Sequence, residues 1–95
     1  MLVKDEAELK RLSGQLAIAM GWAWFDGVGP NGTADKIYLK QNRGWTAEFK
    51  TEIGVQSSDQ KTEQKRMEKL GIPYYLIRSL EDFREAILTE ERKLK

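Results

Sequence analysis

The chain of 95 residues contains no cysteine and no histidine. Without cysteine there is no disulfide framework and no cysteine-type zinc site, and without histidine there are no imidazole ligands and no histidine-based catalysis. Any general base must therefore be a carboxylate, a lysine or a water molecule activated by a metal ion. Because the remaining side chains offer oxygen ligands, a metal site in this chain should suit Mg²⁺ or Mn²⁺ better than zinc.

Long apolar runs and a strong charge bias are also missing. No stretch approaches the roughly 18 apolar residues that a membrane span requires, and the N-terminus mixes acidic with basic side chains, unlike a signal peptide. We therefore expect a soluble, cytoplasmic protein with no membrane partner. The formal net charge is only +1, so binding to nucleic acid would depend on local clusters of basic residues. The length predicts one domain over residues 1–95, whose small core a dimer interface would help to stabilise.

Apolar spacing, capping residues and turn residues predict helices and strands in the order helix, three strands, helix, strand, helix. The helix between the third and fourth strands implies a parallel crossover, so we expect an α/β fold with a mixed sheet of about four strands flanked by helices. The expected ranges are a helix over about 4–20, strands over 22–25, 35–40 and 45–50, a helix over about 57–70, a strand over 74–77 and a final helix that Ser79 caps.

A glycine-rich stretch over residues 27–33 places Gly27, Gly29 and Gly32 at the spacing of a dinucleotide-binding loop. That loop functions because a helix N-terminus follows the glycines and meets the pyrophosphate. Here a strand is predicted to follow, and the glycines flank a proline and an asparagine that are typical of a turn. We therefore expect no nucleotide cofactor.

Asp35, Glu48 and Lys50 are the first candidate functional residues. Because side chains alternate along a strand, Glu48 and Lys50 share one face while Phe49 points to the other. Two carboxylates beside an ammonium group suit metal-dependent phosphodiester cleavage, in which the carboxylates hold a hard divalent cation and the lysine lies near the attacking water or the phosphate. The alternative interpretation is a solvated salt bridge between neighbouring strands.

The predicted hairpin brings the two carboxylates together. With residues 41–44 as its loop, Asp35 lies opposite Lys50. Asp35 and Glu48 are then diagonal neighbours on one face, about 7–8 Å apart at the backbone, so that they could share one cation. A slip of one residue would turn Asp35 to the other face and remove the site.

This arrangement resembles the PD-(D/E)XK nucleases and, more narrowly, the small stand-alone VRR-NUC proteins of phages and bacteria. The likeness extends from about Gly32 almost to the C-terminus. The proline that usually precedes the motif aspartate is Ala34 here, which affects the rigidity of the turn and not ligation. The segments that carry the resemblance are GTADKI at 32–37, AEFK at 47–50, SDQ at 58–60 and GIPYYLIRSLED at 71–82.

The resemblance implies a restriction-endonuclease-like core and a metal-dependent DNA endonuclease. Asp35 and Glu48 would then ligate Mg²⁺ or Mn²⁺, with the backbone carbonyl of Phe49 as a further ligand. Lys50 would orient the attacking water and stabilise the charge that develops on the phosphate.

Two further site residues are implied by the same resemblance. Gln60 follows Lys50 by ten residues at the start of the next helix, where a glutamine would position the lysine or the DNA backbone. Ser57-x-x-Gln60 is also a capping-box pattern, and the two roles are compatible. The opening helix should supply another carboxylate, for which Glu6 matches by spacing and Glu8 is the rival.

Basic side chains predict weak contacts with DNA phosphates. Lys61 and Lys65 repeat at helical spacing, and Lys36 belongs to a second cluster, although a solvated helix face explains such lysines equally well. The resemblance implies a homodimer that acts on branched DNA, such as the four-way (Holliday) junction, in a bacterial or phage-infected cell. The alternatives are a monomeric nuclease for flap or duplex DNA and a non-catalytic module that binds DNA or a protein on the same fold.

Overall fold

Helices and strands follow one another in the predicted order of helix, three strands, helix, strand and helix. The computed structural model describes residues 5–27, 34–50 and 54–94, so the predicted turn at 27–33 lies, apart from Gly27, outside the described residues, as does the predicted start of the first helix at residue 4. The elements are α1 (Glu6–Ala19), β1 (Ala23–Asp26), β2 (Lys36–Lys40), β3 (Arg43–Phe49), α2 (Ser58–Lys69), β4 (Tyr74–Ile77) and α3 (Leu80–Arg92).

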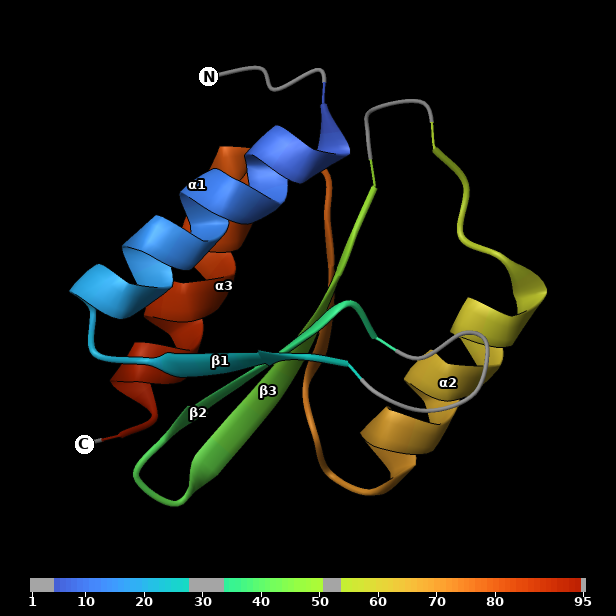
Figure 1. Ribbon diagram of the computed structural model, residues 1–95. Helices are drawn as coiled ribbons and strands as arrows, with labels where there is room; N and C mark the ends of the chain where they lie inside the picture. The colour runs from blue at the N-terminus through green and yellow to red at the C-terminus, as the bar shows by residue number, and fades with distance from the viewer. Residues whose placement is uncertain (1–4, 28–33, 51–53, 95) are drawn as a thin grey trace.

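The four strands form one mixed sheet in the order β1-β2-β3-β4. β1, β2 and β3 pair antiparallel, and β3 pairs with β4 in parallel across the connection that contains α2. Figure 1 shows α1 and α3 side by side against one face of the sheet, with α2 on the other side. The predicted α/β fold class, the mixed sheet and the parallel crossover are therefore confirmed.

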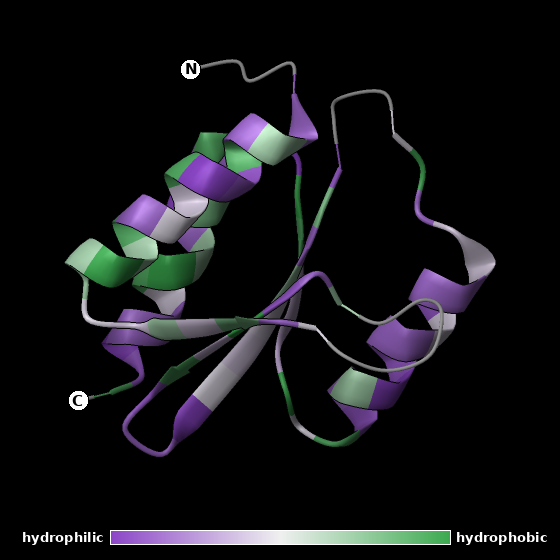
Figure 2. Ribbon diagram, in the orientation of Figure 1, coloured by the Kyte–Doolittle hydropathy of each residue, from purple (hydrophilic) through white to green (hydrophobic). Residues whose placement is uncertain are grey.

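The hydrophobic core lies between the sheet and the layer formed by α1 and α3. Trp45 of β3 is at its centre, stacked on Tyr38 with ring centroids 4.3 Å apart and in edge contact with Trp22. Leu9 of α1 and Phe83 of α3 close the core from the helix side and are 1% and 0% exposed. Apolar residues accordingly concentrate on α1 and α3 in Figure 2. Within the described ranges, no helix is both long enough and apolar enough to cross a membrane.

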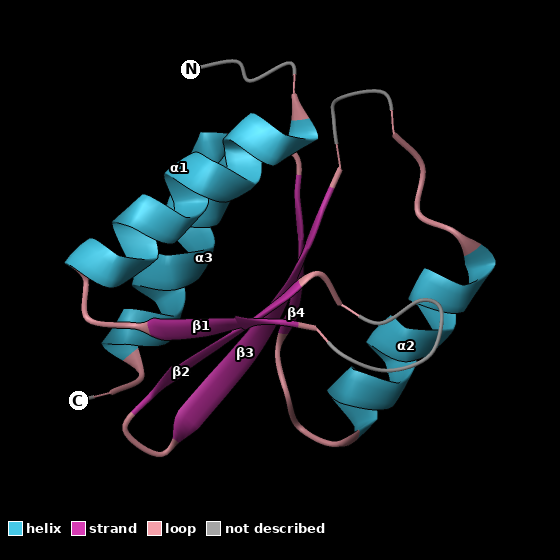
Figure 3. Cartoon of the chain, viewed as in Figure 1, coloured by secondary structure: helices cyan, strands magenta, loops and turns pink. Residues whose placement is uncertain are grey.

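α2 packs loosely and contains no buried residue. Figure 2 shows it as mostly hydrophilic, and Figure 3 shows it as a separate helix on the far side of the sheet from α1 and α3. Met67 and Leu70 are the large apolar residues at its C-terminal end, and only one of them turns inward. Met67 is partly buried, but Leu70 is 63% exposed because it is the C-cap, where the chain turns at Gly71 with φ of 82°.

Each helix begins at the capping residue that the sequence indicates. The carboxylate of Asp5 accepts a 2.8 Å hydrogen bond from the N–H of Ala7, and Ser57 and Ser79 cap α2 and α3 with their side chains. α1 ends before Gly21, whose φ of 85° is in the left-handed region that favours glycine. These local contacts explain why the predicted and observed helix ends nearly coincide.

The hairpin between β2 and β3 has a different register from the predicted one. The prediction paired Lys40 with Trp45 across a four-residue loop, whereas Lys40 pairs with Arg43 in the structure. The loop contains only Gln41 and Asn42, and Gln41 has a φ of 56°, as two-residue hairpin loops require at their first position.

The predicted loop was too long because Gly44 was assigned to it. Gly44 lies instead within β3, where a Cβ atom would approach Cδ2 of Leu39 to 2.9 Å, so the glycine reflects a close side-chain contact and not a turn. The register is shifted by two residues, which preserves the face of every side chain. Continued one residue beyond β2, the observed pairing sets Asp35 directly across from Glu48 instead of across from Lys50.

Candidate functional site

Glu48 is a buried acid near the end of β3, with no exposed surface. Its Oε1 accepts a 2.7 Å hydrogen bond from the hydroxyl of Tyr74 and a 2.9 Å hydrogen bond from the side-chain amide of Gln56. Its Oε2 has no hydrogen-bond partner among the described residues. Because a buried carboxylate oxygen without a partner is unfavourable, this atom marks a position at which a cation or a polar ligand would be stabilised.

Asp35 lies immediately before β2 and is fixed beside the end of β3. Its Oδ2 accepts a 2.7 Å hydrogen bond from the backbone N–H of Phe49, the residue after Glu48. The Phe49 ring is completely buried in the core, which holds this part of the backbone in place. The two predicted carboxylates and the Phe49 backbone therefore occupy neighbouring positions at one edge of the site.

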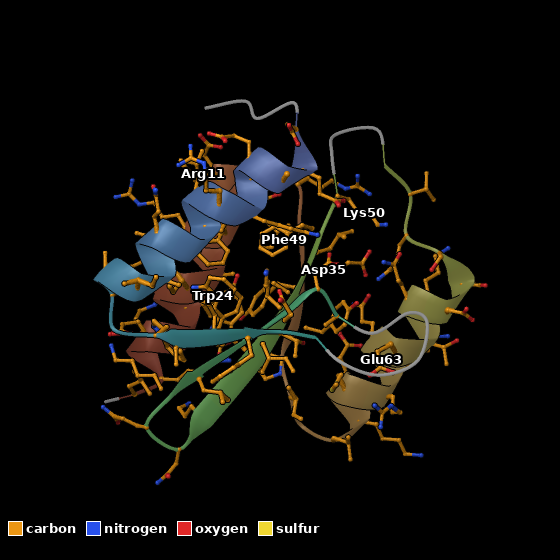
Figure 4. All side chains as sticks on the ribbon, in the orientation of Figure 1. Arg11, Trp24, Asp35, Phe49, Lys50 and Glu63 are labelled. Carbon is orange, nitrogen blue, oxygen red and sulfur yellow. The ribbon has the colours of Figure 1, made fainter. Side chains whose placement is uncertain are left out.

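Lys50 follows β3 and continues its alternation, so that it shares the face of Glu48. Its backbone N–H donates a 3.0 Å hydrogen bond to the carbonyl of Ile77. Figure 4 shows Lys50, Asp35 and Glu63 on the side of the sheet that faces α2. In the described part of the chain the Lys50 ammonium group forms no salt bridge, which leaves it available to an anionic ligand.

Gln60 forms the predicted capping box. Its side-chain oxygen accepts a 2.9 Å hydrogen bond from the N–H of Ser57, and its own N–H donates to the Ser57 hydroxyl at 3.1 Å. Two other glutamines connect this region to the sheet: Gln56 donates to Glu48 and also, at 3.0 Å, to the side-chain oxygen of Gln64. Gln60 thus starts the helix, while Gln56 and Gln64 make the polar contacts that lead to the acid.

The two α1 carboxylates that were considered as ligands point in different directions. Glu8 binds Arg11 on the exposed side of the helix, and the hydrogen bond from Arg11 lowers the pKa of the Glu8 carboxyl. Glu6 lies 3.4 Å from the ammonium group of Lys10, which is 3.7 Å from Oδ1 of Asp35. Glu6 is therefore linked to the site through Lys10, and the geometry favours it over Glu8.

The lysines predicted to contact DNA differ in their surroundings. Lys36 pairs with Asp26 and lies over the ring of Trp24, 4.3 Å from its centroid, on the face opposite Asp35 and Glu48. Lys61 and Lys65 are exposed on α2. Lys61 and Lys65 remain candidates for phosphate contacts, whereas Lys36 is engaged on the other side of the sheet.

Tyr74, Gln56 and Lys10 were not recognised from the sequence. Tyr74 alternates with Tyr75 in β4, but its position next to Glu48 depends on the parallel pairing with β3, which periodicity alone does not align. Gln56 precedes the cap of α2 and belongs to no periodic pattern. Only Lys10 had a usable signal, because it lies four residues after Glu6 on the same helix.

A divalent cation fits these residues only in part. Among the described residues no three acidic side chains converge into a complete metal site. The free Oε2 of Glu48 and the neighbouring carboxylate of Asp35 nevertheless provide two hard oxygen donors. Mg²⁺ is commonly held by one or two carboxylates, with water and substrate phosphate as its other ligands, so this partial set suits it.

Comparisons of the chain with protein-family models, with curated protein sequences and with solved structures find no match. The functional interpretation of the site therefore rests on its residues and their geometry.

The tyrosines of this domain provide a test of the buried network at high pH. Burial, then the hydrogen bond to Glu48 and the nearby carboxylates, raises the pKa of the Tyr74 hydroxyl above its ordinary value of 10.0, and burial similarly raises the pKa of Tyr38 and Tyr75. Above pH 10 the folded state therefore holds more protons than the unfolded chain, so stability is lost as the pH rises further. We expect tyrosinate absorbance to appear together with the loss of circular dichroism. Ionisation near pH 10 in a fully folded protein would contradict this expectation.

Proposed function

We propose that this domain is a divalent-metal-dependent endonuclease that hydrolyses phosphodiester bonds in DNA. The observation that supports this most directly is the buried Glu48 carboxylate near Asp35, one oxygen of which has no partner among the described residues. Both donors to its other oxygen are uncharged, so they leave the negative charge uncompensated. A hard cation is the ligand that such a pair of carboxylates attracts best.

Each residue of the site has a role in this proposal. Asp35 and Glu48 would hold Mg²⁺ or Mn²⁺, with the Phe49 carbonyl as a further ligand and Glu6 contributing directly or through water. A cation held there would supply the Lewis acidity that activates water and offsets charge on the scissile phosphate. The ammonium group of Lys50, which pairs with no acid in the described part of the chain, would orient the attacking water and stabilise the charge that develops on the phosphate.

The proposed substrate is branched DNA, in particular the four-way junction, cut by a homodimer. In this proposal the small α/β domain selects DNA by shape and not by base sequence. Two copies related by a two-fold axis would present two sites to the symmetric strands of a junction. The exposed Lys61 and Lys65 of α2 would contact phosphates.

The decisive experiment is incubation of the protein with a labelled four-way junction, a flap and a linear duplex, each with and without Mg²⁺. We expect Mg²⁺-dependent cleavage that is fastest on the junction. Lys50→Met should lower the rate by about 10²- to 10³-fold, the usual cost of removing one group that stabilises developing charge. Arg92→Met is the matched control, because it removes one positive charge from the exposed last turn of α3.

Two results would contradict the proposal. Absence of Mg²⁺-dependent cleavage on all three DNAs would exclude the nuclease, and equal rates on all three would exclude junction selectivity in favour of a nuclease for simple duplex or flap DNA. An equal loss of activity in Arg92→Met would show that the Lys50 effect reflects only overall charge.

A non-catalytic module that binds DNA or protein is the second candidate. It is favoured by the lack of three converging acids among the described residues and by the two hydrogen bonds that already satisfy Oε1 of Glu48. In that case DNA or protein binding would be independent of Mn²⁺, and calorimetry would detect no uptake of the ion. Metal titration of the DNA-free protein therefore separates the two classes.

A further inference from the structure

Two tyrosine–glutamate pairs, each with a buried glutamate, lie on opposite faces of the sheet. Tyr74 and Tyr75 are consecutive in β4, so their side chains point in opposite directions. Tyr74 donates its hydroxyl hydrogen to Glu48 at 2.7 Å, and Tyr75 donates to Glu90 at 2.5 Å. Glu48 and Glu90 are 0% and 1% exposed. The chain thus contains two tyrosine–glutamate hydrogen bonds to buried acids that can be compared.

The two pairs differ in how the negative charge is balanced. Glu90 also accepts a 2.7 Å hydrogen bond from the ammonium group of Lys93, which forms a salt bridge with it. Glu48 receives hydrogen bonds from Tyr74 and Gln56 alone among the described residues, and both are uncharged. Both bonds to Glu90 are likewise accepted by one oxygen, Oε2, but among the described residues Glu48 is the acid that keeps a fully buried carboxylate oxygen without a partner. The charge of Glu90 is therefore balanced by Lys93, whereas no salt bridge within the described ranges balances that of Glu48.

Both hydrogen bonds to Glu48 converge on the same oxygen, Oε1. The amide nitrogen of Gln56 also donates to Gln64 at 3.0 Å, and the amide nitrogen of Gln64 donates to Glu68 at 3.2 Å. This series of amides connects Glu48 to α2, and the amide nitrogen of Gln56 is held by its two acceptors, Glu48 and Gln64. Two donors on one oxygen prevent rotation of the carboxylate and keep Oε2 in one direction.

We propose that Tyr74 and Gln56 are positioning residues that hold Oε1 of Glu48 so that Oε2 serves as a single, pre-oriented oxygen ligand for a divalent cation. The inference rests on the proposed function, because it concerns the same site. Partners of metal-ligating side chains usually contribute about 10- to 100-fold to metal affinity or activity, since they fix the orientation of the ligand. One oxygen per carboxylate also suits Mg²⁺, which requires nearly octahedral geometry and few protein ligands.

The test is Mn²⁺ binding to the DNA-free 95-residue protein by isothermal titration calorimetry. Tyr74→Phe removes one hydroxyl group and should weaken Mn²⁺ binding about tenfold or more. Tyr75→Phe is the matched control on the same strand, because it removes the equivalent hydroxyl from the Glu90 pair. It should leave Mn²⁺ affinity at the wild-type value, although urea denaturation should detect lower stability in both variants. Gln56→Met provides a second test that does not alter β4, with the same expected loss of affinity.

The dependence of the cleavage rate on Mn²⁺ concentration supplies a second measurement. If Tyr74 had only a structural role, the Tyr74→Phe substitution would not change this dependence. Since Glu48 is still present in Tyr74→Phe, raising the Mn²⁺ concentration should restore its cleavage rate to the wild-type value. Wild-type Mn²⁺ affinity in both Tyr74→Phe and Gln56→Met would overturn the inference, as would an equal loss in Tyr75→Phe. If the wild-type protein itself took up no Mn²⁺, the proposed function would fail, and that result is distinct from a failure of the positioning role alone.

Discussion

Glu48→Gln is expected to abolish metal-dependent cleavage while leaving the fold intact. Glutamine keeps an oxygen that can accept the hydrogen bonds of Tyr74 and Gln56, so the buried network survives. The amide nitrogen replaces Oε2, the oxygen that has no partner within the described residues, and cannot ligate a hard cation. A bound metal contributes several kcal/mol of transition-state stabilisation. Its loss should lower the cleavage rate by about a thousandfold or by a larger factor. Cleavage assays and Mn²⁺ calorimetry on the same preparation measure both effects.

Glu90→Gln is the matched control for this substitution. Glu90 is equally buried and is also bound by a tyrosine, but it lies on the opposite face of the sheet. Loss of its salt bridge with Lys93 should lower stability and leave both Mn²⁺ uptake and cleavage unchanged. Wild-type cleavage by Glu48→Gln, or an equal loss in Glu90→Gln, would exclude Glu48 as a metal ligand.

Trp45→Ala should have the largest effect on stability. The indole is completely buried and touches the rings of Trp22, Tyr38, Tyr75 and Phe83. Truncation of a buried tryptophan typically costs about 3–5 kcal/mol, because apolar contacts are lost and a cavity remains. A domain of this size has a free energy of unfolding of only about 5–15 kcal/mol, so a large share of its stability would disappear. Urea denaturation followed by circular dichroism gives the value directly.

Two milder variants keep this expectation measurable if Trp45→Ala does not fold. Trp45→Phe retains a ring in the same place and should cost about 1–2 kcal/mol. Trp24→Ala should also cost about 1–2 kcal/mol, since Trp24 is only partly buried, against Gly14 and Lys36. A larger destabilisation from Trp24→Ala than from Trp45→Ala would mean that the centre of the core lies under β1 and not under β3.

The fold was predictable from the sequence wherever the determining contacts are local. Asp5, Ser57 and Ser79 cap their helices through neighbouring N–H groups, and such contacts depend only on nearby residues. The hairpin register was mispredicted because Gly44 has two possible explanations, a turn or a close contact. Only the position of Leu39 across the strand pair distinguishes them.

The candidate site was also predictable only in part, namely where strand alternation determines which face a side chain occupies. Alternation placed Glu48 and Asp35 on one face, and that assignment survived the register error because a shift of two residues preserves faces. The partners of Glu48 were not predictable, because Tyr74 reaches it through the parallel pairing of β3 with β4 and Gln56 through an irregular segment before α2. Contacts between distant parts of the chain leave no periodic trace in the sequence.

The consecutive tyrosines of β4 also determine the register in which that strand pairs with β3 during folding. A shift of β4 by one residue would turn Tyr74 toward the core and Tyr75 toward α2, away from the acids that they bind. Glu48 and Glu90 would each lose a hydroxyl donor in the interior, at a cost of about 1–3 kcal/mol per group. The aliphatic residues that follow, Leu76 and Ile77, are similar in size and would not oppose the slip strongly. Correct alignment of this strand is thus encoded by two phenolic groups that recognise carboxylates on opposite sides of the sheet.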